Sequence, residues 1–234
     1  MDIFDFPPIA ALLDGASTAL AALGGVVTPG VAIVLVTIAI RTALIPLALA
    51  TVRAEGHRRR LAPRIAQLRS RFARQPDRLQ RETLALYAAE KVSPIAGLLP
   101  GLAQAPVLTL VYALFTSPTI DGHANALLSA TFLGAPLGRH LIAATSGFLA
   151  TDGVAIALLV VIAIVAGLSR RAARRIAVPL DPAQQGIADL LSWTPFLTVI
   201  FAAIVPLAAT VYLAVSTSWT LVERAVMRRV LWAR

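Results

Sequence analysis

The sequence predicts an all-α membrane protein with five transmembrane helices, an N-terminus outside the cytoplasm, a C-terminus inside it, and a cytoplasmic helical hairpin between spans 1 and 2. The first reason is composition: 58% of the 234 residues are hydrophobic and 14% are charged, against about 25% charged in a typical soluble domain. The second is charge placement. Nineteen of the 21 Lys and Arg residues lie in three segments, 52–91, 169–189 and 223–234, which the positive-inside rule places in the cytoplasm.

These basic segments determine how often the chain crosses the membrane. Residues 1–28 contain three acids and no Lys or Arg, so they are expected outside, along the membrane interface. One span leads from the N-terminal segment into the first basic segment. Because all three basic segments lie on the same side of the membrane, an even number of spans must separate each of them from the next. The expected boundaries are 1–28 for the extracytoplasmic N-terminal interfacial segment, 29–52 for span 1, 53–92 for the cytoplasmic helical hairpin, 93–117 for span 2, 118–152 for the outer loop, 153–169 for span 3, 170–189 for a cytoplasmic loop, 190–205 for span 4, 206–223 for span 5 and 224–234 for a basic cytoplasmic tail.

The last two spans are separated by a proline. The stretch 190–222 has 33 uncharged residues, about 50 Å as one helix against a ~30 Å hydrocarbon core. Pro206 lies near its middle and would break a helix there, which favours two spans. Spans 3 to 5 are short for the full core, so either they thin the bilayer locally or their helices extend beyond these boundaries.

The hairpin segment has the pattern of two helices. Pro63 suits the first turn of a helix, apolar residues recur at three- and four-residue spacing as far as Phe72, and Gln75-Pro76-Asp77 predicts a turn. We therefore expect helices over about 63–74 and 77–91. Six arginines of this segment are candidates for docking a partner: Arg58, Arg59, Arg60, Arg64, Arg69 and Arg71.

Two explanations of the hairpin's positive charge remain open. It would set the topology and contact anionic lipids. Alternatively, it would dock an acidic partner such as ribosomal RNA, a targeting receptor or a nascent chain. Specific nucleic-acid readout is not expected, because the sequence contains neither RNA-binding aromatics nor a nucleic-acid motif.

Arg41 lies inside the apolar run 31–52, which is 22 residues long. It is roughly 15 Å of helix from either interface, and a charge at that depth costs about 2.5–3.5 kcal/mol on insertion scales. No other apolar run contains an acid that could pair with it. We therefore expect Arg41 to face a water-filled cavity inside the membrane, and we take this cavity as the predicted functional site.

Polar residues of the other spans are expected to line this cavity as a substrate groove. Thr37 lies four residues before Arg41, on the same helix face, and Gln104 lies in the middle of span 2. Interhelical hydrogen bonding explains these two residues equally well. The candidate groove residues are Arg41, Thr37, Gln104, Tyr212 and Ser216.

Prolines and tryptophans complete the pattern expected of the spans. Three prolines are expected to kink their helices: Pro46, Pro100 and Pro106. Three tryptophans are expected to anchor the chain at the membrane interfaces: Trp193, Trp219 and Trp232.

Nothing in the sequence indicates covalent chemistry. The absence of Cys excludes disulfides, thiolate metal sites and lipid attachment through cysteine. The three histidines are isolated in the sequence, so no metal site is expected. No phosphate-binding loop and no nucleophile–base arrangement is found. We therefore expect a protein that is not an enzyme and uses no cofactor.

Ordered motifs across the chain resemble one family. Thr37, Arg41 and Pro46 form the pattern T-x-x-x-R-x-x-x-x-P, which resembles the first core span of the YidC family of membrane protein insertases. The string AEKVSPIAGLLPGLAQAPVLTLVYALF at 89–115 resembles the end of that family's hairpin and its second span. DPAQQ at 181–185 and VYLAVSTSW at 211–219 resemble the start of its fourth span and part of its fifth. The chain is most similar to the short, Gram-positive-like core form.

The resemblance implies a function as a membrane protein insertase and chaperone, in the bacterial plasma (inner) membrane as a multi-pass protein. A hydrophilic groove would admit the short polar tails of nascent membrane proteins, and their hydrophobic helices would leave sideways into lipid. Arg41 would attract the carboxylates of such tails. The implied partners are nascent membrane proteins, the ribosome, a targeting receptor and the Sec translocon.

Two other functions stay open at this point. A non-inserting membrane-protein assembly scaffold would tolerate the loss of Arg41. A small-solute or ion transporter would use the same buried arginine but predicts internal repeats and paired broken helices. No such repeat is visible in the sequence, so the transporter is the weaker alternative.

Overall fold

The computed structural model describes residues 27–90, 119–120, 123–124, 130–141, 152–176 and 182–232. This part of the chain is mostly helical, which agrees with the predicted all-α class. The helices are α2 (Pro29–Ala43), α3 (Ile45–Arg71), α4 (Pro76–Ala89), α7 (Asp152–Ile176), α8 (Pro182–Leu191), α9 (Thr194–Ile204) and α10 (Leu207–Trp232). The predicted N-terminal interfacial segment and span 2 lie outside the described residues.

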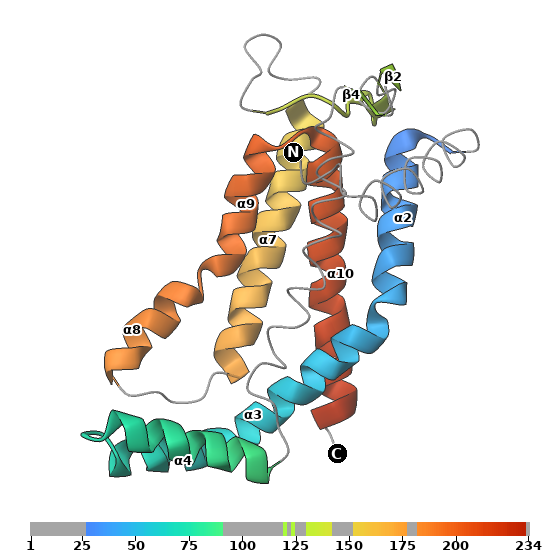
Figure 1. Ribbon diagram of the computed structural model, residues 1–234. Coiled ribbons are helices and arrows are strands. Elements are labelled where there is room, and N and C mark those ends of the chain that lie inside the picture. The colour runs from blue at the N-terminus through green and yellow to red at the C-terminus, as the bar shows by residue number, and fades with distance from the viewer. Residues whose placement is uncertain are drawn as a thin grey trace.

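Helix α10 is the centre of the described structure. It packs against α2, α3, α7 and α9, and Figure 1 shows α2, α7 and α9 running beside it while α3 and α4 lie across one end. Every residue from 207 to 214 is buried, and most of these residues belong to the main apolar core. The core therefore surrounds the first half of α10.

A bend separates α2 from α3. The two helices meet at an angle of 54°, and Leu44 is the residue between them. Pro46 is the second residue of α3. It has no N–H to donate to the carbonyl of Thr42, and its ring crowds that carbonyl, so a straight helix cannot continue through this point.

The first helix of the hairpin begins earlier than the sequence predicts. α3 runs without interruption from the bend and holds Pro63 in its interior, whereas Pro63 was expected in a first turn. The chain changes direction at Leu44, where α2 ends, and α3 then continues as one helix from Ile45 through Pro63 to Arg71. The second helix, α4, agrees closely with the predicted range, and an ion pair from Arg64 to Glu90 joins the two helices at 2.5 Å.

Apolar length supports a membrane location for part of the chain. Gly153–Arg175 of α7 is long and apolar enough to cross a membrane, and α2 with α3 also qualifies when the bent pair is counted as one span. Within α7, Val160 and Ile164 are 52% and 57% exposed. Large apolar side chains exposed along one helix are expected where lipid, rather than water, covers the surface.

Two of the predicted short spans correspond to longer helices. α7 has 25 residues, about 37 Å at roughly 1.5 Å per residue, and α10 has 26 residues. Both extend past the uncharged runs into the arginine-rich segments. The break between α9 and α10 falls at Val205 and Pro206, where the sequence predicts it.

A short segment, residues 130–141, lies over the start of α10, and we call it the strap. Its strands β3 (Thr131–Phe132) and β4 (Ala135–Pro136) pair antiparallel; a second short pair is formed by β1 (Thr119–Ile120) and β2 (His123–Ala124). The N–H groups of Leu207 and Ala208 donate to the carbonyls of Arg139 and Leu137, at 2.8 and 2.9 Å. Helix N-termini leave such donors without helical partners, so the strap caps α10.

Candidate functional site

Arg41 lies in the last turn of α2, facing α10, and its residue surface is 8% exposed. Its Nε donates a hydrogen bond to Ser216 Oγ at 3.1 Å. A second guanidinium nitrogen, Nη2, donates to the same oxygen. The neutral hydroxyl orients the guanidinium against α10 but does not balance its positive charge.

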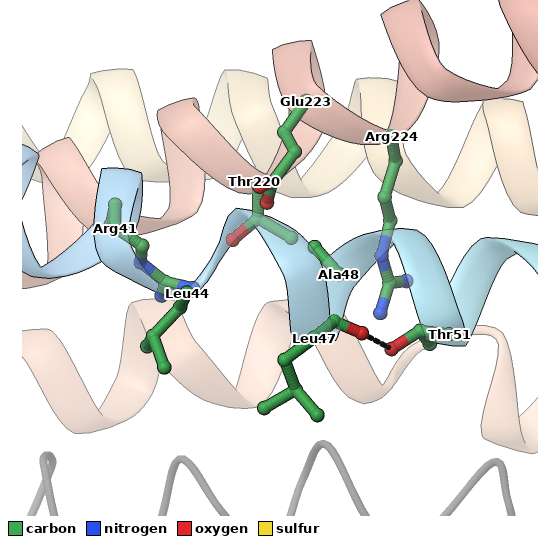
Figure 2. A pocket seen from close by; sticks show the side chains of 8 residues that line it. All are labelled: Arg41, Leu44, Leu47, Ala48, Thr51, Thr220, Glu223 and Arg224. Atoms are coloured by element: carbon green, nitrogen blue, oxygen red, sulfur yellow. Dashed lines mark hydrogen bonds between the residues drawn. The ribbon is translucent and has the colours of Figure 1, made fainter.

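An acid and a second arginine share a cavity with Arg41. The cavity has a volume of about 60 Å³ and lies between α10 and the bend of α2 and α3. Figure 2 shows Glu223 and Arg224 reaching from α10 toward the bend, with Arg224 beside Thr51. Glu223 attracts Arg41 electrostatically, whereas Arg224 repels it. The residues that line this Arg41 cavity are Arg41, Leu44, Leu47, Ala48, Thr51, Thr220, Glu223 and Arg224.

Sequence reasoning missed Glu223 as a neighbour of Arg41. Glu223 is the first residue after the uncharged run 190–222 and the last residue of predicted span 5, so it lies just outside the apolar runs that were expected to face Arg41. A signal was nevertheless present. Ser216, Thr220 and Glu223 are spaced by four and three residues, which puts them on one helix face.

The Arg41 cavity contains charged side chains and is large enough for water. Among the residues that line it, Glu223 has a buried carboxylate oxygen, Oε1, which makes no hydrogen bond of good geometry with the described residues. Its volume of about 60 Å³ exceeds the roughly 10–15 Å³ that a cavity needs to hold one water molecule. Charged groups and buried polar atoms supply the partners that such waters need.

A wider groove opens on the other side of Arg41. It has a volume of about 700 Å³ and is bounded by α7, α9 and α10. One wall is apolar, whereas Arg41 and hydroxyl side chains of α10 make the other wall polar. The residues that line this wide groove are Arg41, Ser169, Pro195, Leu197, Thr198, Ile200, Phe201, Ile204, Leu213, Ser216, Thr217, Thr220 and Arg224. Arg41 thus lines both spaces.

The other predicted groove residues are placed differently. Thr37 is 2% exposed, and its hydroxyl donates to the carbonyl of Ile33 at 2.6 Å. Tyr212 is 3% exposed within the apolar core. Neither residue is among those that line the Arg41 cavity or the wide groove, whereas Ser216 is. Gln104, with Pro100 and Pro106, lies outside the described residues.

The hairpin arginines fall on α3. Arg59, Arg60, Arg64 and Arg71 are exposed and Arg69 is half-buried; the side chain of Arg58 is outside the description. Two of them contact aromatic rings: Arg59 lies 5.4 Å from the centre of the Trp232 ring, and Arg71 lies 5.4 Å from that of Phe72.

The end of α10 is fastened to α3 below the Arg41 cavity. Arg228 donates to both carboxylate oxygens of Glu55, at 2.8 and 3.0 Å. The Trp232 indole lies so close to Gly56 that an added Cβ there would be 3.0 Å from its Nε1. This contact holds α10 against α3. In the part of the chain that the structure describes, no three potential metal ligands gather.

Comparison with known proteins gives consistent matches. A family model described as 60Kd inner membrane protein matches residues 22–233. A relative from Dechloromonas aromatica, named Membrane protein insertase YidC, is 42% identical over 83 residues, which cover 36% of this chain and 15% of the relative. Relatives of the same name from Granulibacter bethesdensis and Methylobacillus flagellatus are 41% and 34% identical, over 36% and 42% of this chain and 14% and 18% of their own lengths. The matched segments therefore span less than a fifth of these curated relatives.

Proposed function

Because the chain belongs to the 60Kd inner membrane protein family, we propose that it inserts nascent membrane proteins into the bacterial plasma membrane and assists their folding there. The observation that carries the proposal is the position of Arg41. It is buried in an apolar helix and donates a hydrogen bond to Ser216. It lines the Arg41 cavity together with Glu223, and it also lines the wide groove. Hydrated space at that position lowers the free energy of bringing polar chain into the membrane.

The proposed first step is exchange of the carboxylate that faces Arg41. A nascent protein's polar tail enters the wide groove, and an acidic side chain on it takes over the attraction that Glu223 provides at rest. Two unit charges 4 Å apart attract by about 4 kcal/mol at an effective dielectric constant of ~20. Because Glu223 regains its place when the tail moves on, the tail is held transiently.

The second step is sideways release of the apolar helix. The wide groove has an apolar wall on α9, where Leu197 and Ile200 are each 61% exposed. A nascent helix of about 20 apolar residues is long enough to span the bilayer, and it gains the free energy of leaving water as it slides along this wall into lipid. No covalent step is involved.

The remaining sequence predictions belong to the same proposal. The chain crosses the membrane five times, with its N-terminus outside and its C-terminus inside. Thr37 and Tyr212 lie one helical turn from Arg41 and Ser216 and support the groove from the core, while Gln104 lines it from span 2. The hairpin arginines receive nascent chains. The further partners of the protein are the ribosome, a targeting receptor, the Sec translocon and anionic lipids.

Insertion into liposomes tests the proposal. The substrate is a single-span protein with a short acidic N-terminal tail, and the readout is the fraction of tail protected from external protease. We expect Arg41→Lys to keep most of the activity and Arg41→Ala to lose about tenfold or more. Arg81→Ala on α4 removes the same charge from an exposed site and serves as the matched control.

The scaffold alternative predicts a different result. If Arg41→Ala inserts the tail as well as the wild type does, the buried arginine is not required for insertion. Binding of the same substrate without protection of its tail would then identify an assembly scaffold.

A further inference from the structure

A second basic pocket lies at the end of α7. It has a volume of about 510 Å³, and none of its residues lines the Arg41 cavity or the wide groove. Its members on α7 are spaced by three or four positions and therefore lie on one face of the helix. We call it the α7 arginine pocket; it is lined by Gly167, Arg170, Arg171, Arg174, Arg175, Trp193 and Phe196.

Aromatic rings form one wall of this pocket. The guanidinium carbon of Arg170 lies 3.8 Å from the centre of the Trp193 ring, close enough for a cation–π interaction. Arg170 Nε also donates to Ser192 Oγ at 3.0 Å. The rings of Trp193 and Phe196 lie 5.2 Å apart, centre to centre. Arg170 is therefore held in a fixed orientation, and the other three arginines line the rest of the pocket.

Positive charge exceeds negative charge at the pocket. Among the described residues, the acid that pairs with the cluster is Asp189, which lies 2.6 Å from Arg174. Arginines four residues apart on one helix repel each other, and α7 has two such pairs here. The positive-inside rule and the helix dipole explain basic residues at this helix end, but not their gathering around an aromatic wall. An anion bound in the pocket would offset this repulsion.

The surroundings indicate which anion fits. The pocket lies at the end of the apolar segment Gly153–Arg175, which is the level of the lipid headgroups if α7 crosses the membrane. Tryptophan is typical of that level. Leu190, Leu191 and Leu197 next to the pocket are 73%, 64% and 61% exposed, so an apolar surface continues from it. RNA would match the charge but not this surface.

We propose that the α7 arginine pocket binds the phosphate of an anionic phospholipid, with the acyl chains lying along the exposed apolar side of α9. Arginine binds phosphate oxygens in pairs through its planar fork. This site does not depend on insertase activity. It requires only that α7 end at a membrane surface.

Native mass spectrometry of the full chain in detergent tests the proposal. The protein is titrated with phosphatidylglycerol and, separately, with phosphatidylcholine. The variant Arg171→Gln/Arg175→Gln removes two charges and leaves the Arg170–Trp193 stack intact. The control Arg78→Gln/Arg81→Gln removes two charges from α4, and a thermal melt of each protein verifies folding. We expect the pocket variant to bind phosphatidylglycerol about tenfold more weakly, with phosphatidylcholine binding unchanged and the control like the wild type.

Three results would overturn the proposal. An equal loss of phosphatidylglycerol affinity in both double variants would mean that binding depends only on the total charge of the protein. Displacement of the lipid by millimolar inorganic phosphate would indicate a site for free anions. Tighter binding of a short RNA than of phosphatidylglycerol, lost in the pocket variant, would assign the pocket to nucleic acid.

Discussion

The two groups of arginines in this protein differ in burial and in what holds them. Arg41 is 8% exposed, and its hydrogen-bond partner Ser216 is 175 residues away in the chain. In the α7 arginine pocket, the side chain of Arg174 is 53% exposed and its partner Asp189 is 15 residues away. The first arginine depends on packing between distant helices, whereas the second depends on a helix end and the segment that follows it.

This difference bears on how each site responds to mutation. A buried charge that loses a partner keeps its desolvation cost, which is large inside an apolar helix pair. An exposed charge that loses a partner is solvated by water instead, so its loss changes stability little. Substitutions that remove a partner of Arg41 should therefore lower the stability of the protein. Substitutions in the α7 arginine pocket should change its affinity for a ligand more than they change the stability of the protein.

The largest effect on stability is expected from Ser216→Ala. This change removes the hydroxyl that accepts two guanidinium hydrogen bonds without adding bulk, and a hydrogen bond to a charged group contributes about 1.5–3 kcal/mol. We expect a loss of roughly 2 kcal/mol, measured as a lower melting temperature of the purified protein in detergent. Ser218→Ala on the same helix is the control. Equal melting temperatures for the two variants would show that Ser216 does not stabilise Arg41.

A smaller effect is expected from Glu223→Gln. The substitution keeps the size of the side chain and removes a negative charge that attracts Arg41, but Glu223 is partly exposed and water replaces some of the lost attraction. We expect a loss of about 1 kcal/mol in the free energy of unfolding, determined by denaturant titration. Glu82→Gln on the exposed side of α4 should leave that free energy unchanged. A Glu223→Gln protein as stable as the wild type would mean that Arg41 is balanced by other groups.

The smallest change in stability is expected from Asp189→Asn. The pair with Arg174 is exposed on both sides, and such pairs contribute about 0–1 kcal/mol. Removing the acid also raises the net positive charge of the α7 arginine pocket. We therefore expect phosphatidylglycerol to bind severalfold more tightly, by native mass spectrometry, with a melting temperature near that of the wild type. Weaker lipid binding would contradict the assigned role of the pocket.

Several features of the fold followed from local sequence. The break at Pro206, the turn before Asp77 and the apolar length of α7 each depend on a proline, a turn motif or composition within a short window. The bend near Pro46 was also expected, although its centre lies at Leu44. The continuity of α3 through Pro63 was not, because a proline within a run of helix-forming residues is compatible with a helix start as well as with a helix interior.

The positions of the charges, breaks and apolar lengths can be predicted without the structure, since these are properties of adjacent residues. One charge in one apolar run is enough to predict a polar site at Arg41. Which groups meet that charge depends on how the helices pack. Ser216 and Glu223 come from α10 and reach Arg41 through packing of α2, α3 and α10, and Trp193 meets Arg170 because α9 folds back on α7. Contacts between distant segments depend on how whole helix faces fit together, which no local pattern specifies.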